Sequence, residues 1–246
     1  MSIKHLKPWM FFCSSVLLWC IPICDASEFL ECIIEPRITV EFRSQSPGIL
    51  DEVLVDRGDR IKKGQIIARL KYGVEEAVVQ QTRTLLDFAR RKNERNRDLS
   101  ARNLIAQQEK DEIETEMRKL EKQLLEAEER LKLRTIRSTI DGIVIERVLY
   151  AGEYAGENTP ILKASAIDPL NVEVVVPIRL YGTIKKGMRA DVHPEEPVGG
   201  IHKGEVTIVD QVMDAASGTF GVRVELANRE YLIPAGLKGK IQFNQN

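Results

Sequence analysis

The chain has 246 residues and a formal net charge of −1, from 36 basic and 37 acidic side chains. Hydrophobic residues make up 43% and charged residues 30%, a balance that favours a globular fold and excludes a disordered chain. The near-zero net charge argues against a nucleic-acid-binding protein, and an aromatic content of 6% argues against a base-stacking surface. We therefore expect no nucleic acid among the partners.

Residues 1–26 have the pattern of a cleaved signal peptide. Two lysines precede an apolar run at residues 9–24, and the small residue Ala26 stands at the expected cleavage site. The run is shorter than the roughly 20 apolar residues that a spanning helix needs, and it contains a proline. The alternative is an uncleaved membrane anchor. Cleavage would leave Cys32 as the single cysteine, which we expect to be a small buried side chain.

Residues 46–70 and 139–164 form two copies of one β-motif, related by an ungapped offset of 94 positions that places Gly48 on Gly142. Each copy has short runs of β-branched residues separated by glycine turns, a pattern typical of tight antiparallel strands. Neither copy can close a core alone, so we expect the two to pack face to face. The glycines that we assign to the turns of these half motifs are Gly48, Gly58, Gly64, Gly142 and Gly152.

Between the copies, residues 73–136 contain one glycine, no proline and many strong helix formers. Hydrophobic positions recur in alternating steps of four and three, the spacing of a coiled-coil seam, with a break at residues 100–105 and Asn103 as the turn residue. Both ends must return to one β-domain, so the helices form an antiparallel hairpin with arms about 40 Å long that projects into solvent. The predicted seam is Val74, Val78, Gln81, Leu85, Phe88, Lys92, Arg95 and Leu99 in the first helix, and Ile113, Met117, Leu120, Leu124, Ala127 and Leu131 in the second.

The last third of the chain, residues 167–246, has short strand-like runs separated by turns that contain glycine. Even spacing of several short strands is typical of a small closed β-barrel. We interpret Asp168-Pro169 as a linker into this barrel. The predicted strands are Asn171–Pro177, Ala190–His193, Gly204–Val209, Gly221–Leu226 and Gly239–Phe243.

This order of parts resembles the HlyD-like family of periplasmic adaptor proteins, also called membrane fusion proteins. The barrel segments 204–206, 222–223 and 232–236 also resemble that family. The resemblance implies an α+β, mostly β fold: a lipoyl-like barrel-sandwich hybrid with an inserted antiparallel coiled-coil hairpin, followed by a small β-barrel. The implied domains are the signal peptide at 1–26, the hybrid at 37–72 plus 137–166, the hairpin at 73–136 and the barrel at 167–246.

The resemblance also implies a channel-docking role for the hairpin tip. Adaptors that dock on TolC-like channels often carry Arg, then Leu four residues on, then Ser seven residues further on. Arg95 and Leu99 fit this pattern, whereas Ala106 stands at the serine position and cannot offer a hydroxyl to the channel. The channel-docking residues implied in this way are Arg95, Leu99, Arg102 and Ala106.

The family's properties imply a non-enzymatic periplasmic subunit without a cofactor. Its implied partners are an inner-membrane transporter of the RND type, a TolC-like outer-membrane channel and further copies of itself in a ring of three or six. Residues 27–36 and 244–246 are too short for the membrane-proximal domain that many adaptors add. His193 and His202 lie in a Pro/Gly-rich segment, where we expect exposed side chains and no metal site.

Two alternatives stay open at this stage. The first is an adaptor of an ABC-type, or type I, secretion system that is retained by its N-terminal segment. The second is a biotinyl or lipoyl carrier domain, which needs a lysine at a hairpin tip after the Gly-Gln-Ile-Ile strand. The ungapped register places Val74 at that tip, and Lys71 opens the helical arm instead.

Overall fold

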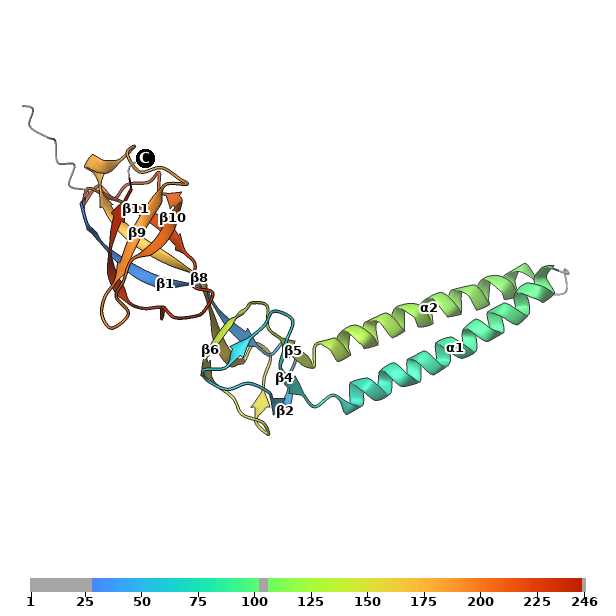
Figure 1. Ribbon diagram of the computed structural model, residues 1–246. Coiled ribbons are helices and arrows are strands. Elements are labelled where there is room, and N and C mark those ends of the chain that lie inside the picture. The colour runs from blue at the N-terminus through green and yellow to red at the C-terminus, as the bar shows by residue number, and fades with distance from the viewer. Residues whose placement is uncertain (1–27, 102–105, 245–246) are drawn as a thin grey trace, which may run out of the picture.

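The computed structural model describes residues 28–101 and 106–244. The predicted signal peptide at 1–26, together with Arg102 and Asn103, lies outside the described residues. Figure 1 shows three parts in succession: a β-barrel, a smaller β-body and a long helical hairpin. No helix in the described residues is long and apolar enough to cross a membrane. The predicted fold class is confirmed.

In the described part of the chain, six strands form the barrel, and pairing of β8 with β1 closes it. Around the barrel the order is β1, β12, β9, β10, β11 and β8. The strands are β1 (Leu30–Arg43), β8 (Pro160–Pro177), β9 (Arg189–Pro194), β10 (His202–Val209), β11 (Thr219–Leu226) and β12 (Lys238–Phe243). Alternate residues point inward, as the period of a strand requires. Buried side chains that fill the barrel include Ile34, Leu170, Val172, Val192, Val206, Val224 and Ile241. Each of the five predicted strands falls within β8–β12.

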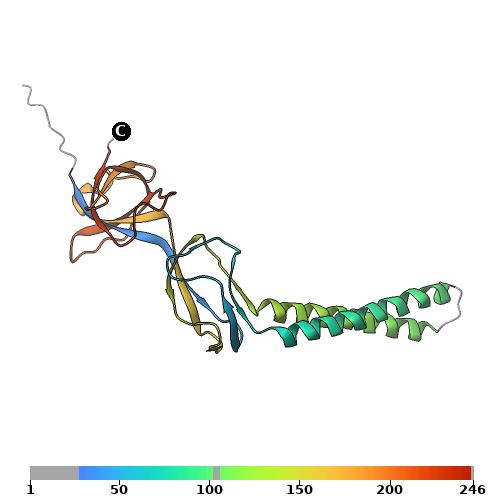
Figure 2. The same cartoon turned by 60° about the horizontal axis from the view of Figure 1, so that its bottom comes forward.

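The longest strands, β1 and β8, run without a break from the barrel into the β-body (Figure 2). Residues Leu30–Ile33 of β1 pair with β12 and complete the barrel. These residues belong to none of the domains predicted from the sequence. The prediction of a linker at Asp168-Pro169 is wrong, because this dipeptide lies inside β8. A proline is tolerated there because the pairing shifts its register opposite Pro36–Ile38, where a ladder hydrogen bond is not needed.

The β-body is a sandwich of the two half motifs. A four-stranded sheet in the order β5, β4, β2, β7 packs on the part of the other sheet formed by β1, β8, β6 and β3. The new strands are β2 (Gly48–Val53), β3 (Arg60–Ile61), β4 (Ile66–Leu70), β5 (Thr135–Arg137), β6 (Gly142–Arg147) and β7 (Tyr154–Ala155). The buried core between the sheets includes Phe42, Leu50, Ile67, Leu70, Ile161 and Leu162.

The two half motifs exchange equivalent hydrogen bonds. The Leu50 amide donates to the Glu153 carbonyl at 2.9 Å, and the Val144 amide donates to the Asp59 carbonyl at 2.9 Å. Leu50 and Val144 stand 94 positions apart, as do Asp59 and Glu153, so each bond is the counterpart of the other. These bonds lie beside the strand pairs β2–β7 and β3–β6, in which each half motif adds a strand to the sheet of the other. The shared buried core between the two sheets confirms that the two copies pack face to face.

Three of the five half-motif glycines lie in turns. Gly58, Gly64 and Gly152 have φ values of +93°, +86° and +91°, the left-handed region that favours glycine. Gly142 is instead the first residue of β6, and a Cβ there would lie 2.2 Å from the Ser165 carbonyl oxygen. This glycine is therefore required by close approach of two backbones and not by a turn.

The hairpin consists of α1 (Gly73–Ala101) and α2 (Gln107–Lys132), which run antiparallel for about 40 Å. In both views the hairpin is joined to the β-body at one end only and projects away from it (Figures 1 and 2). In α2, Ile113, Leu120 and Ala127 are buried against α1, as the predicted seam requires.

The predicted seam of α1 is wrong by one residue along its whole length. Val79, Leu86 and Ala89 are buried against α2, and Leu86 is 1% exposed. The predicted positions Leu85 and Phe88 are 48% and 57% exposed. The larger apolar residues of α1 therefore form a second stripe at the same spacing, turned by one residue, or about 100°, from the helix interface.

Candidate functional site

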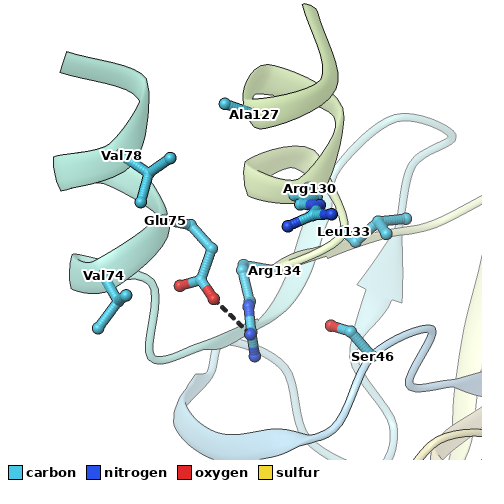
Figure 3. Close-up of a pocket in the computed structure, with 8 residues that line it drawn as sticks. All are labelled: Ser46, Val74, Glu75, Val78, Ala127, Arg130, Leu133 and Arg134. Carbon is cyan, nitrogen blue, oxygen red and sulfur yellow. Dashed lines mark hydrogen bonds and ion pairs between the residues drawn. The ribbon is translucent and has the colours of Figure 1, made fainter. Parts of the chain in front are cut away.

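The hairpin is the feature that distinguishes this chain from a plain β-protein, and its base is fixed by one arginine. Arg134, which follows α2, forms an ion pair with Glu75 in the first turn of α1 (Figure 3). Both side chains are 19% exposed. The Arg134 guanidinium also donates to the Pro47 carbonyl at 2.7 Å. One side chain thus connects both helices to the loop that precedes β2, and we call Glu75, Arg134 and Pro47 the hairpin anchor.

Gly48 makes room for the hairpin anchor. It is the first residue of β2 and does not lie in a turn, which corrects the assignment from the sequence. A Cβ at Gly48 would lie 2.7 Å from Nη1 of Arg134. The role of this glycine is therefore to admit the guanidinium that holds the hairpin.

The two lateral faces of the hairpin differ in chemistry. On one face, ion pairs join the helices: Arg83 contacts Glu128 at 2.9 Å, and Arg90 contacts Glu121 at 3.3 Å. We call this the charged face. The opposite face, which we call the apolar face, carries the exposed stripe of α1 and two grooves between the helices. Residues that line these grooves are Val74, Val78, Leu85, Phe88 and Lys92 of α1, and Ile113, Glu116, Leu120 and Arg130 of α2.

Of the predicted channel-docking residues, Arg95, Leu99 and Ala106 lie at the free end of the hairpin. Arg95 is exposed near the end of α1, and Leu99 is 39% exposed. Ala106 precedes α2 as its N-cap residue, with φ −69° and ψ 147°, and provides no side-chain cap. Arg102 lies outside the described residues. The docking role of these residues stays a prediction.

The two histidines of the barrel do not lie in exposed loops, which corrects that expectation. His193 belongs to β9 and makes an edge-to-face contact with Phe29 at 5.3 Å. His202 belongs to β10, and its Nε2 lies 3.1 Å from the Gly199 carbonyl. Both are half-buried, because strand pairing extends into the Pro/Gly-rich segment. Across the described residues, no group of three His, Cys, Asp or Glu side chains has the geometry to hold a metal ion.

The carrier-domain alternative places its cofactor lysine at a hairpin tip after β4. Here β4 ends at Leu70, the Lys71 amide donates to the Ile49 carbonyl at 2.9 Å, and α1 begins at Gly73. The chain therefore enters a long helix at the place where a carrier domain turns back. This geometry does not offer the exposed tip on which a lysine-linked cofactor needs to swing.

Comparisons with known proteins agree with this architecture. A family model for the CzcB-like barrel-sandwich hybrid domain matches residues 39–165, and one for the CusB-like beta-barrel domain matches residues 170–246. An uncharacterized protein of Haemophilus influenzae (strain Rd) is 20% identical over 191 residues, which are 78% of this chain and 50% of that protein. The nodulation protein NolF of Rhizobium meliloti is 22% identical over 200 residues, 76% of this chain and 54% of NolF. The chain thus spans about half the length of these curated relatives.

Solved structures of several adaptor proteins share this fold. A MacA-MexA chimeric protein that contains the Pseudomonas aeruginosa MexA α-hairpin domain aligns with a TM-score of 0.75 and 17% identity, over 89% of this chain and 82% of that one. The membrane fusion protein Spr0693 of Streptococcus pneumoniae aligns with a TM-score of 0.66 and 16% identity, over 89% of this chain and 100% of that one. Because the first family model covers more than half of the sequence and the second covers the barrel, the chain belongs to the CzcB-like family of membrane fusion, or adaptor, proteins.

Proposed function

We propose that this protein is the periplasmic adaptor subunit of a tripartite efflux system and has no catalytic activity of its own. In this proposal it joins an inner-membrane transporter of the RND type to a TolC-like outer-membrane channel, and three or six copies assemble into a ring. The observation that carries the proposal is the anchored hairpin, which holds an arm about 40 Å long away from the β-body.

The anchored hairpin is suited to hold two partners at a fixed distance. Glu75, Arg134 and Pro47 connect both helices to the β-body, so a force at one end of the arm is passed to the other. Between residues 90 and 97, near the free end, five side chains are basic and one is acidic. Such an excess favours encounter with an acidic rim on a partner, because complementary charge accelerates association.

Export measurements with tip variants test the proposal. In cells that lack the native gene, we expect the wild-type chain to restore resistance to the exported compounds, scored over a panel of toxic organic compounds and metal salts. Arg95→Glu and Leu99→Asp should abolish this rescue, because both changes alter the proposed docking surface. Normal rescue by both variants would overturn the docking assignment.

Matched control variants separate docking from folding. Lys122→Glu reverses an exposed charge on α2, and Leu125→Asp replaces an exposed leucine there. Both lie away from the tip, so we expect them to restore export fully. A photo-crosslinking residue at position 95 should capture an outer-membrane channel in cells, and capture of inner-membrane proteins alone would contradict the proposed orientation.

Sequencing of the mature N-terminus tests the location. A start near Ser27 supports a processed periplasmic subunit. A start at Met1 supports the alternative adaptor of a type I secretion system that keeps its N-terminal segment as an anchor.

A further inference from the structure

The paired strands β1 and β8 are irregular at the place where they pass from the barrel into the β-body. Their pairing changes from Pro36 with Leu170 to Ile38 with Ala166, so one residue of β1 lies opposite three residues of β8. Such a bulge interrupts the hydrogen-bond ladder and lets the strands bend. It lies between two separate hydrophobic cores, since Leu170 belongs to the barrel core and Ala164 to the core of the β-body. We call this place the strand bulge.

The loop between β11 and β12, residues 227–237, is fixed to the strand bulge by Asn228. The side-chain amide of Asn228, which is 4% exposed, donates to the carbonyls of Ile167 and Ile233, both at 2.9 Å. Its backbone amide donates to the Asp168 carboxylate at 2.9 Å. A buried polar group with its hydrogen bonds satisfied holds its surroundings rigid. The loop is therefore held firmly against β8.

This loop contacts the β-body through an arginine. The Arg60 guanidinium, at the start of β3, lies 4.5 Å from the centre of the Tyr231 ring and donates to the Glu230 carbonyl at 3.4 Å. A guanidinium at this distance is attracted by the negative face of an aromatic ring. In the sheet, β6 separates β3 from β8, so the contact lies to one side of the strand bulge. We call Arg60 and Tyr231 the latch.

The backbone of Tyr231 shows that the latch is held at an energetic cost. Its φ of 58° lies in the left-handed region, which bulky side chains rarely adopt. Among the described residues the other non-glycine position with a positive φ is Asn158, and asparagine tolerates that region well. Opening of the latch would let Tyr231 return to an ordinary conformation. The closed state is thus opposed by strain and favoured by a cation–π contact of comparable size.

We propose that the latch and the strand bulge form a two-state hinge between the barrel and the β-body. With the latch closed, the two parts turn together. With the latch open, the barrel swings about the strand bulge. A partner that binds one arrangement more tightly shifts the balance by its difference in affinity. The inference goes beyond the proposed function and does not rest on it, because both states belong to a single chain.

Distance measurements by electron paramagnetic resonance on the purified full chain test the hinge. Spin labels carried by non-natural residues at Lys63 of the β-body and Lys203 of the barrel report the angle between the two parts, and both positions are exposed. Arg60→Gln and Tyr231→Leu should each raise the ratio of open to closed molecules about two- to fivefold, because each removes the cation–π contact. Tyr231→Phe keeps the aromatic ring and should match the wild type.

Two further variants separate the latch from a general loss of structure. Arg57→Gln removes a neighbouring exposed arginine outside the latch and should leave the distances unchanged. The double variant Arg60→Gln/Tyr231→Leu should match the single variants, because either change already breaks the contact. Circular dichroism must show that all variants are folded, and if Tyr231→Leu does not fold, the comparison of Arg60→Gln with Arg57→Gln decides.

Unchanged distances in Arg60→Gln would overturn the hinge, as would an equal effect of Arg57→Gln or additive effects in the double variant. The measurement uses the chain without partners. Loss of export in the tip variants therefore has no bearing on this result, and failure of the hinge leaves the proposed function untouched.

Discussion

The Glu75 carboxylate and the Arg134 guanidinium meet where the hairpin leaves the β-body, and this contact fixes how α1 is turned about its own axis. Residues four and eleven positions after Glu75 lie on the same side of a helix. These residues are Val79 and Leu86, and both are buried against α2. The hairpin anchor therefore selects which of the two stripes of α1 faces the second helix.

Removal of the anchoring arginine should destabilise the protein at the hairpin base. Arg134→Ala leaves Glu75 without its partner in a largely buried position, and we expect a loss of about 1–2 kcal/mol, between the values for exposed and buried pairs. Urea unfolding followed by circular dichroism measures it. Arg130→Ala removes an exposed ion pair with Glu126 and should cost less than about 0.5 kcal/mol. Equal effects of the two variants would argue against the anchor.

Two neighbouring leucines of α1 should respond very differently to truncation. Leu86→Ala opens a cavity beside Ala89 and Leu120 and should cost about 2–4 kcal/mol. Leu85→Ala changes an exposed side chain and should cost less than about 0.5 kcal/mol. Thermal unfolding at low concentration measures both. The reverse order would restore the seam expected from the sequence.

Three glycine-to-alanine changes distinguish glycines that are needed because neighbouring atoms leave no room for a Cβ from a glycine that has space around it. Gly142→Ala forces a Cβ against the Ser165 carbonyl and should cost about 3 kcal/mol or more. Gly48→Ala displaces only the flexible end of Arg134, so its cost should match that of Arg134→Ala. Gly73→Ala meets nothing within 4 Å and should be neutral or slightly stabilising. Denaturant midpoints of the three variants provide the test, and a stable Gly142→Ala would contradict the packing of β6 on β8.

A serine at position 106 should stabilise the start of α2. Ala106 has the extended backbone of an N-cap residue but no side chain that accepts from the first amides of the helix. Ala106→Ser should therefore add about 0.5–1 kcal/mol, and Ala106→Gly should add less. Hydrogen exchange of the first-turn amides of α2 reports the effect. If Ala106→Ser improves export without slower exchange, the result supports the proposed contact of this position with a channel and not an effect on the helix.

The thiol of Cys32 should be unreactive in the folded protein. Burial in the barrel raises its pKa from 9.0 to about 11, because the thiolate loses its hydration. The folded state then holds this proton to higher pH than the unfolded chain. The corresponding stability is complete below pH 9 and falls as the pH rises from 9 toward 11. Alkylation at pH 8, mapped by mass spectrometry, should label Cys32 only after unfolding.

The sequence predicts the architecture well because its signals are local and repeated. Glycines paired at a constant offset indicate the half motifs, and the absence of proline between residues 73 and 136 indicates the hairpin. The five barrel strands follow from short β-branched runs between turns. The prediction at Asp168-Pro169 is wrong because a proline at a register shift has the same local pattern as a proline in a linker.

The rotation of α1 could not be predicted from periodicity. Its exposed stripe contains larger apolar residues than its interface, where Ala89 and Thr82 allow close approach to α2. The deciding contact, between Glu75 and Arg134, joins polar residues far apart in the sequence. The spacing of hydrophobic residues carries no information about an ion pair between distant polar residues.

The strands β1 and β8 run through both the barrel and the β-body and couple the two parts mechanically. A paired ribbon of this kind resists stretching, so a torque applied to the barrel is delivered to the sandwich and, through Arg134, to the arm. A turn of about 5° at the base sweeps the far end of an arm of about 40 Å through roughly 3.5 Å. That displacement is enough to make or break a set of hydrogen bonds. Small rotations of the β-body would thus be magnified at the free end of the hairpin.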